Sequence, residues 1–161
     1  MSGLIAGNLS AYAINALDNQ GLNLPKSPKG NVPSLPSDIT SVADDGLMDL
    51  FVLFTSWSDY IGVQVACAQV DEKAAQRALD LAEIASYAQS STTGGRVTDN
   101  KAKAALHPQV VSAQETFDNR YAYRKLIESL QASVERDAAL ISRELTRRTS
   151  ITSTRRDRWT A

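Results

Sequence analysis

The residues best suited to do chemistry are basic ones, and they gather late in the chain. Residues 120–161 hold 10 basic and 5 acidic side chains, whereas residues 1–119 hold 7 basic and 13 acidic ones. On a helical wheel at 100° per residue, four of the late cations fall within about 40° of one another: Lys125, Arg136, Arg143 and Arg147. Four more arginines and a tryptophan follow them: Arg148, Arg155, Arg156, Arg158 and Trp159.

Arginine is suited to forked contacts with phosphates, and an aromatic ring among arginines can stack on an unpaired base. These nine residues are therefore our candidates for binding nucleic acid, single-stranded DNA in particular. Acidic residues interleave with them, at Glu128, Glu135, Asp137, Glu144 and Asp157. Salt bridges within or between subunits are an equally good interpretation of the arginines.

No group of residues points to catalysis. His107 stands alone before Pro108, without partners at the spacing of a metal site or an acid–base pair, and we expect a surface or capping role. Cys67 lies among small apolar residues, so we expect it to be a core residue. Gly94-Gly95 is a turn and not a phosphate-binding loop. We therefore expect a protein that is not an enzyme, with no metal and no cofactor.

The composition favours a small helical protein that completes its core by association. The chain has 161 residues, 43% of them hydrophobic but only 6% aromatic, and much of the apolar content is alanine. A long alanine seam lets another helix approach closely, so we expect a homo-oligomer. With one cysteine and nothing resembling a signal peptide or a membrane span, we expect a reducing cytoplasm and no membrane partner.

Residues 1–40 form an expected N-terminal arm. Its first part has the loose spacing of a short amphipathic helix over residues 4–17. Residues 18–40 hold four of the five prolines and predict an extended linker. We expect the arm to dock on a neighbour, with the alternative that it is a disordered tail. The expected oligomer or partner contacts are Leu4, Ile5, Leu9, Tyr12, Leu17, Phe54 and Trp57.

Residues 41–149 are expected to form a helical hairpin. Ser41 with Asp44 resembles a capping box, and apolar residues at 3–4 spacing predict one helix from there to about Gln89. A short helix over residues 98–106 follows a turn, and Pro108 suits the start of a helix that runs to about Arg148. Residues 150–161 form a basic tail. The predicted fold is all-α: a long antiparallel hairpin with a short middle helix and a proline-rich arm.

The predicted core joins the two long helices. We expect bulky residues of the first helix to pack against the apolar stripe of the last, in the same chain or in a neighbour. The first set is Leu50, Phe54, Trp57 and Ile61, and the second is Ile127, Leu130, Val134, Ile141 and Leu145.

Parts of the sequence from about residue 57 to 148 resemble the UvsY family of T-even phage recombination mediators. The resemblance rests on residues 57–60 (WSDY), on the alanine-rich run ending at Tyr87, on residues 97–106, and on residues 121–128 (YAYRKLIE) followed by Ser142-Arg143. It implies an all-helical oligomer that binds single-stranded DNA and helps load a recombinase. The family carries more basic residues late in its first helix than this chain does.

Two functions remain open from the sequence. The first is a phage-type recombination mediator in the cytoplasm of an infected host, with single-stranded DNA and a recombinase or other phage proteins as partners. The second is a virion or head-associated assembly protein whose arm laces onto neighbouring subunits. A third, a regulatory helical adaptor, is neither supported nor excluded.

Overall fold

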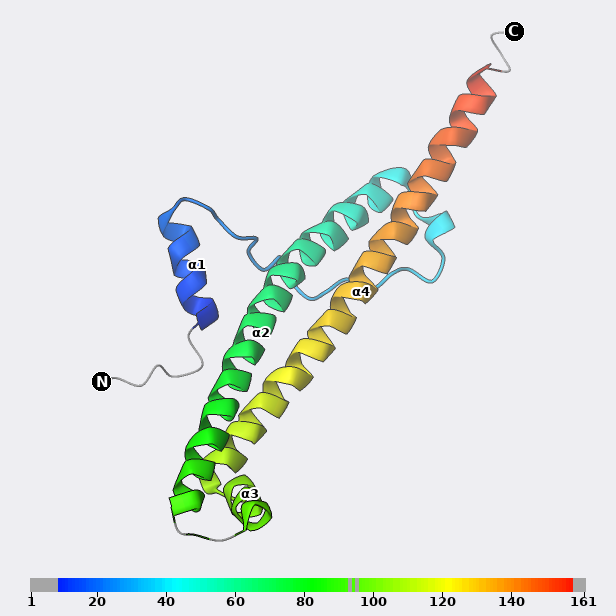
Figure 1. Ribbon diagram of the computed structural model, residues 1–161. Helices are drawn as coiled ribbons and strands as arrows, with labels where there is room; N and C mark the ends of the chain where they lie inside the picture. Colours follow the sequence, from blue (N-terminus) through cyan, green and yellow to red (C-terminus); the bar gives the residue numbers. More distant parts are fainter. Residues whose placement is uncertain (1–8, 93, 95, 158–161) are drawn as a thin grey trace. The chain divides into compact units, whose positions relative to one another are not determined.

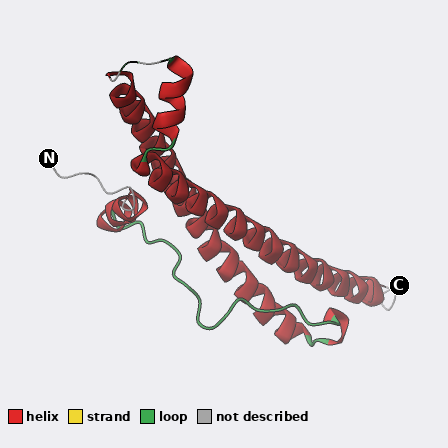
Figure 2. Ribbon diagram, turned by 90° about the horizontal axis from the view of Figure 1, so that it is seen from below, coloured by secondary structure: helices red, strands yellow, loops and turns green. Residues whose placement is uncertain are grey.

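The structure, a computed structural model, describes the backbone of residues 9–92, 94 and 96–157 and the side chains up to residue 151. The described part is helical and contains no strand (Figure 2), which confirms the all-α prediction. The elements are helix α1 (Leu9–Asn19), a 3₁₀ helix η1 (Ile39–Ser41) and the helices α2 (Asp44–Thr92), α3 (Val97–Ala105) and α4 (Pro108–Asp157).

The chain divides into two compact units, and each of the long helices contributes to both. Unit 1 comprises residues 1–24 and 64–127, and unit 2 comprises residues 25–63 and 128–161. This division differs from the predicted arm, hairpin and tail. The linker belongs to the same unit as the start of α2, and α4 continues as a helix to Asp157, through most of the expected tail.

In unit 2 the first part of α2 packs antiparallel against the last part of α4 (Figure 1). Asp44 at the start of α2 pairs with Arg148. Further along α2, Gly62 faces Gln131, which lies earlier on α4. Among the described residues, the largest fully buried side chains all lie in this unit: Leu47, Phe54, Val134 and Ile141.

In unit 1 the second part of α2 packs against the first part of α4 and against α3. Arg124 of α4 forms a two-pronged ion pair with Glu72 of α2. The Ser86 hydroxyl donates a hydrogen bond of 3.1 Å to the carbonyl oxygen of Ala104, near the end of α3. Small residues line this interface, with Ala68, Ala75 and Ala104 buried. The alanine seam therefore serves contacts within the chain.

Helix ends follow local chemistry. The His107 ring nitrogen Nδ1 accepts the Gln109 backbone N–H at 3.4 Å, so His107 caps α4 just before Pro108. Gly21, with φ of 75°, stops α1 in the left-handed conformation that glycine adopts without strain. The predicted capping box is wrong: the Ser41 hydroxyl donates to the carbonyl oxygen of Asp38, and it is Asp38 that caps η1.

The buried stripe of α2 departs from the predicted one. Phe54, Trp57 and Ile61 are buried as expected, whereas the predicted Leu50 is half-buried. Later in α2 the buried positions are Val65, Ala68, Ala75, Leu79 and Ser86, which do not follow a strict seven-residue repeat. Such a repeat drifts relative to the 3.6-residue turn of a helix, and over the length of α2 the drift reaches about one residue. On α4, Leu130 and Tyr123 are 42% and 51% exposed, so they do not belong to the core.

One described helix, α2, contains a stretch long and apolar enough, by length and composition alone, to cross a membrane. Several of the apolar side chains of this helix, including Phe54 and Ile61, are buried in unit 2. The core helix of a soluble protein passes the same test. The expectation that the chain has no membrane partner stays a prediction.

Candidate nucleic-acid interface

The candidate interface lies on the part of α4 that belongs to unit 2. Val134 and Ile141 on this helix are buried, whereas Arg136, Arg143 and Arg147 are exposed. The three arginines stand seven and four residues apart, which places them on one side of the helix. The separation of an apolar from a basic side, predicted from the wheel, is therefore present in the structure.

The three exposed arginines differ in how far they are engaged. Arg143 forms no hydrogen bond or ion pair with the described part of the chain. Arg136 reaches the hydroxyl of Ser133 at 2.9 Å and a carboxylate oxygen of Asp137 at 3.4 Å, yet its side chain remains 68% exposed. Arg147 donates two hydrogen bonds to Glu144, at 2.6 and 2.7 Å, and remains 53% exposed. Arg143 and Arg136 are thus the most accessible cations of this face.

The other predicted cations have different surroundings. Lys125, in unit 1, is exposed, and its ammonium lies 5.7 Å from the centre of the Tyr121 ring. Arg155 and Arg156 lie on α4, but their side chains fall outside the described residues. Arg158 and Trp159 lie outside the described residues altogether.

Arg148 holds the end of the linker and the start of α2, a role that the sequence did not indicate. Its Nη1 donates to the carbonyl oxygen of Val42 at 2.7 Å and to the carboxylate of Asp44 at 2.6 Å. Its Nη2 donates to the carbonyl oxygens of Thr40 and Ile39 at 2.9 and 3.2 Å. Only 18% of the side chain is exposed. Because its guanidinium already donates hydrogen bonds to these acceptors, Arg148 has few N–H groups left to bind a phosphate. We therefore no longer count it among the candidate nucleic-acid-binding residues.

Glu144 lies between two arginines, whose positive charges offset the negative charge of its carboxylate. Hydrogen bonds from Arg147 and then from Arg148, which donates through Nε at 2.8 Å, lower the pKa of Glu144 to about 2. The hydrogen bond to Asp44 and then that to Glu144 raise the pKa of Arg148 above its ordinary value. This group of charges, which we call the arm anchor, consists of Glu144, Arg147, Arg148 and Asp44.

The sequence carried a partial signal for the arm anchor. Glu144 and Arg148 stand four residues apart, the spacing of a helical ion pair. Nothing local, however, pairs Arg148 with Asp44 or with carbonyl groups more than a hundred residues away. Those partners depend on the antiparallel register of α2 and α4.

The expected oligomer contacts fall into two groups. Phe54 and Trp57 are 0% and 8% exposed, which corrects their assignment as partner contacts, because α4 of the same chain covers the apolar stripe of α2. On α1, Leu9 and Tyr12 are 44% and 72% exposed, and Leu17 is half-buried. Leu4 and Ile5 lie outside the described residues.

Unit 1 has a groove beside α1 that is lined by both polar and apolar side chains. It encloses about 270 Å³ and is lined by Ser10, Ala11 and Ile14 of α1, by Gln64, Cys67, Ala68 and Asp71 of α2, and by Arg120 and Tyr123 of α4. The Asp71 atom Oδ1 is buried and has no hydrogen-bond partner in the described chain. Burial, and then the neighbouring Asp71, raise the pKa of the Cys67 thiol, so this cysteine is not an activated nucleophile.

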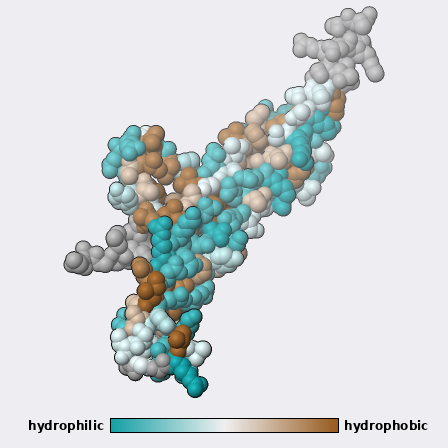
Figure 3. All heavy atoms as spheres, in the orientation of Figure 1, coloured by the Kyte–Doolittle hydropathy of each residue, from teal (hydrophilic) through white to brown (hydrophobic). Residues whose placement is uncertain are grey.

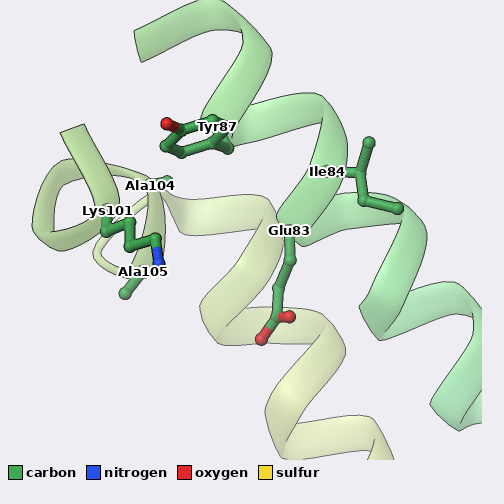
Figure 4. Close-up of a pocket in the computed structure, with 6 residues that line it drawn as sticks. All are labelled: Glu83, Ile84, Tyr87, Lys101, Ala104 and Ala105. Carbon is green, nitrogen blue, oxygen red and sulfur yellow. The ribbon is translucent and has the colours of Figure 1, made fainter. Parts of the chain in front are cut away.

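A second hollow lies where α2 meets α3 in unit 1. It encloses about 370 Å³ and is lined by Glu83, Ile84, Tyr87, Lys101, Ala104 and Ala105 (Figure 4). Ile84, which lines this hollow, is 67% exposed, and Leu106, which follows α3, is 78% exposed. Figure 3 shows separate hydrophobic patches among hydrophilic ones on this face of the molecule. Within the described residues, no three potential ligands gather as a metal site would need.

Comparisons with known proteins add no relative. No family model matches the chain, and neither a curated protein nor a solved structure is significantly similar to it.

Proposed function

We propose that this protein is a non-catalytic recombination mediator of the phage type, an oligomer that binds single-stranded DNA and helps to load a recombinase. The observation that carries the proposal is the exposed basic side of α4 in unit 2, where Arg136 and Arg143 remain accessible while the opposite side of the helix is buried. The resemblance of residues 57–148 to the UvsY family supports the same function.

The spacing of these arginines suits a backbone-tracking surface. Seven residues of α-helix span about 10 Å at 1.5 Å per residue, a distance over which a single strand presents more than one phosphate. Binding of this kind is independent of base sequence and sensitive to salt. Arg147 and the arginines after residue 151 would extend the surface, and Lys125 would offer a separate contact in unit 1.

The test is the salt dependence of DNA binding by the full chain. Each phosphate contact to a single strand changes the slope of log affinity against log salt by about 0.7. The double variant Arg136→Ala with Arg143→Ala should therefore bind every sequence more weakly and flatten the slope by about 1.4. Fluorescence anisotropy with a labelled oligonucleotide across a salt series measures both quantities.

The matched control is Arg77→Ala, which removes an exposed cation of α2 in unit 1. Its slope should equal that of the wild-type protein. Absence of DNA binding by the wild-type protein at low salt would refute the proposal, and so would an equal loss of slope in the control.

A second candidate function is a virion or head-associated assembly protein. One specific observation favours it: the arm anchor ties residues 39–44 to α4 and so holds the linker that carries α1. In this candidate the arginines serve protein contacts. It would replace the first if the double variant failed to assemble while wild-type protein showed no affinity for DNA.

A further inference from the structure

We propose that α1 is exchanged between copies of this protein, so that the groove on α2 and α4 in unit 1 takes the α1 helix of a second copy. The groove residues from the long helices are Gln64, Cys67, Ala68, Asp71, Arg120 and Tyr123. The occupant is known from the structure itself, because α1 of the same chain already lies against these residues. This inference does not depend on DNA binding.

The contact made by α1 within one chain is thin. None of the residues of α1 is buried, and Leu9 and Tyr12 keep much of their apolar surface in solvent. Beneath the helix the groove leaves about 270 Å³ unfilled and leaves Asp71 Oδ1 without a hydrogen bond. The other carboxylate oxygen, Asp71 Oδ2, lies 3.9 Å from Nη1 of Arg120, so α1 neither fills the groove nor satisfies all of its polar atoms, and its hold on the groove within one chain is weak.

The linker permits exchange. Within the described residues, the segment 23–37 forms no hydrogen bond with any helix. An extended proline-rich segment of this length spans roughly 45 Å at about 3.1 Å per residue. Arg148 holds the far end of the linker, at residues 39–44. Val32, Leu35 and Pro36 just before it are half-buried, so exchange would move the earlier part of the linker together with α1.

Exchange between identical copies leaves the groove with the same kind of occupant. A second copy presents the same helix to the same groove, so the packing that α1 gives up within its own chain forms again between chains.

The native cysteine, the only one in the chain, supplies the test. One chain carries Ala11→Cys with Cys67→Ser, and the other is wild type with a tag that changes its size. The two are mixed at several concentrations and treated with a short bismaleimide. Exchange predicts a crosslinked product of mixed size whose yield rises with protein concentration. Each chain treated alone measures the background of symmetric products.

A single chain with Ala11→Cys and native Cys67 reports docking within the chain, as an internal crosslink at monomer size. An internal product without any mixed product at high concentration would overturn the proposal. Absence of both products would overturn it as well, because α1 would then not occupy the groove.

A matched pair of variants checks the docking side of α1. Ile14 lines the groove and is half-buried, whereas the adjacent Asn15 is exposed. Introduced into the Ala11→Cys chain, Ile14→Asp should abolish the mixed product, and Asn15→Asp should leave it unchanged. Equal yields from the two variants would show that the groove does not hold α1 by this side.

Discussion

The contribution of Trp57 to the free energy of unfolding can be worked out from its surroundings. Its ring is 8% exposed and meets the ring of Tyr60 edge to face, with 5.9 Å between the centroids. Its indole Nε1 is buried and has no hydrogen-bond partner in the described chain. The side chain therefore contributes apolar burial and at the same time carries a penalty for an unsatisfied donor. Two substitutions separate these effects.

The magnitudes follow from the two contributions. Truncating a buried aromatic residue to alanine costs about 3–5 kcal/mol. Removing an unsatisfied buried donor offsets about 1–3 kcal/mol of that cost. Trp57→Ala should therefore cost less than Phe54→Ala, which removes a fully buried ring with no polar atom. Trp57→Phe loses only about 1 kcal/mol of apolar burial and sheds the same donor, so it should be neutral or stabilising.

The assay is equilibrium unfolding in urea, followed by circular dichroism at 222 nm because all the elements are helical. The three variants should rank with Phe54→Ala least stable, Trp57→Ala next, and Trp57→Phe equal to or above wild type. A loss of more than about 3 kcal/mol in Trp57→Phe would refute the reasoning, since it would require a hydrogen bond from Nε1.

The described contacts lead to three further predictions. Arg148→Met should release residues 39–44, which hydrogen exchange would detect as faster exchange there, whereas Arg143→Met should leave that exchange unchanged. The pKa of Glu144 lies at about 2, below its ordinary value of 4.5. The stabilisation that ionised Glu144 gives to the folded state is therefore complete above pH 4.5 and is lost as the pH falls toward 2. The melting temperature of wild type should drop across that window more steeply than that of Glu144→Gln. A Cβ on Gly62 would meet Gln131 at an ordinary 3.6 Å, so Gly62→Ala should stabilise the protein by about 0.5–1 kcal/mol in urea unfolding, and a loss of stability would show that the helices require closer approach there.

Most of the helical content was predictable from residues close in sequence. Proline density in the linker, the turn around Gly94 and Pro108 at the start of a helix are local signals, and the observed helices begin and end within a few residues of the predicted ones. The end of α4 was the exception. The helix was predicted to stop near residue 148, but it continues to Asp157, because residues with adequate intrinsic helix propensity can extend a helix beyond its packed part.

The candidate site was predictable only in part. The wheel alone separated the exposed arginines of α4 from its buried stripe, because both depend on the period of a single helix. It did not distinguish the roles of the neighbours Arg147 and Arg148. Arg147 keeps half of its side chain in solvent, whereas Arg148 is enclosed by acceptors from the linker and from α2.

The sequence by itself determined that the chain is all-helical, that α4 has an apolar and a basic side, and that a proline-rich segment precedes α2. These features follow from dihedral preferences and side-chain periodicity, which act over a few residues. Only the tertiary structure decided that Phe54 and Trp57 face α4 of the same chain and that Arg148 is withdrawn from solvent. Both outcomes depend on the register between segments about a hundred residues apart, and that register is selected by the packing of all their contacts together.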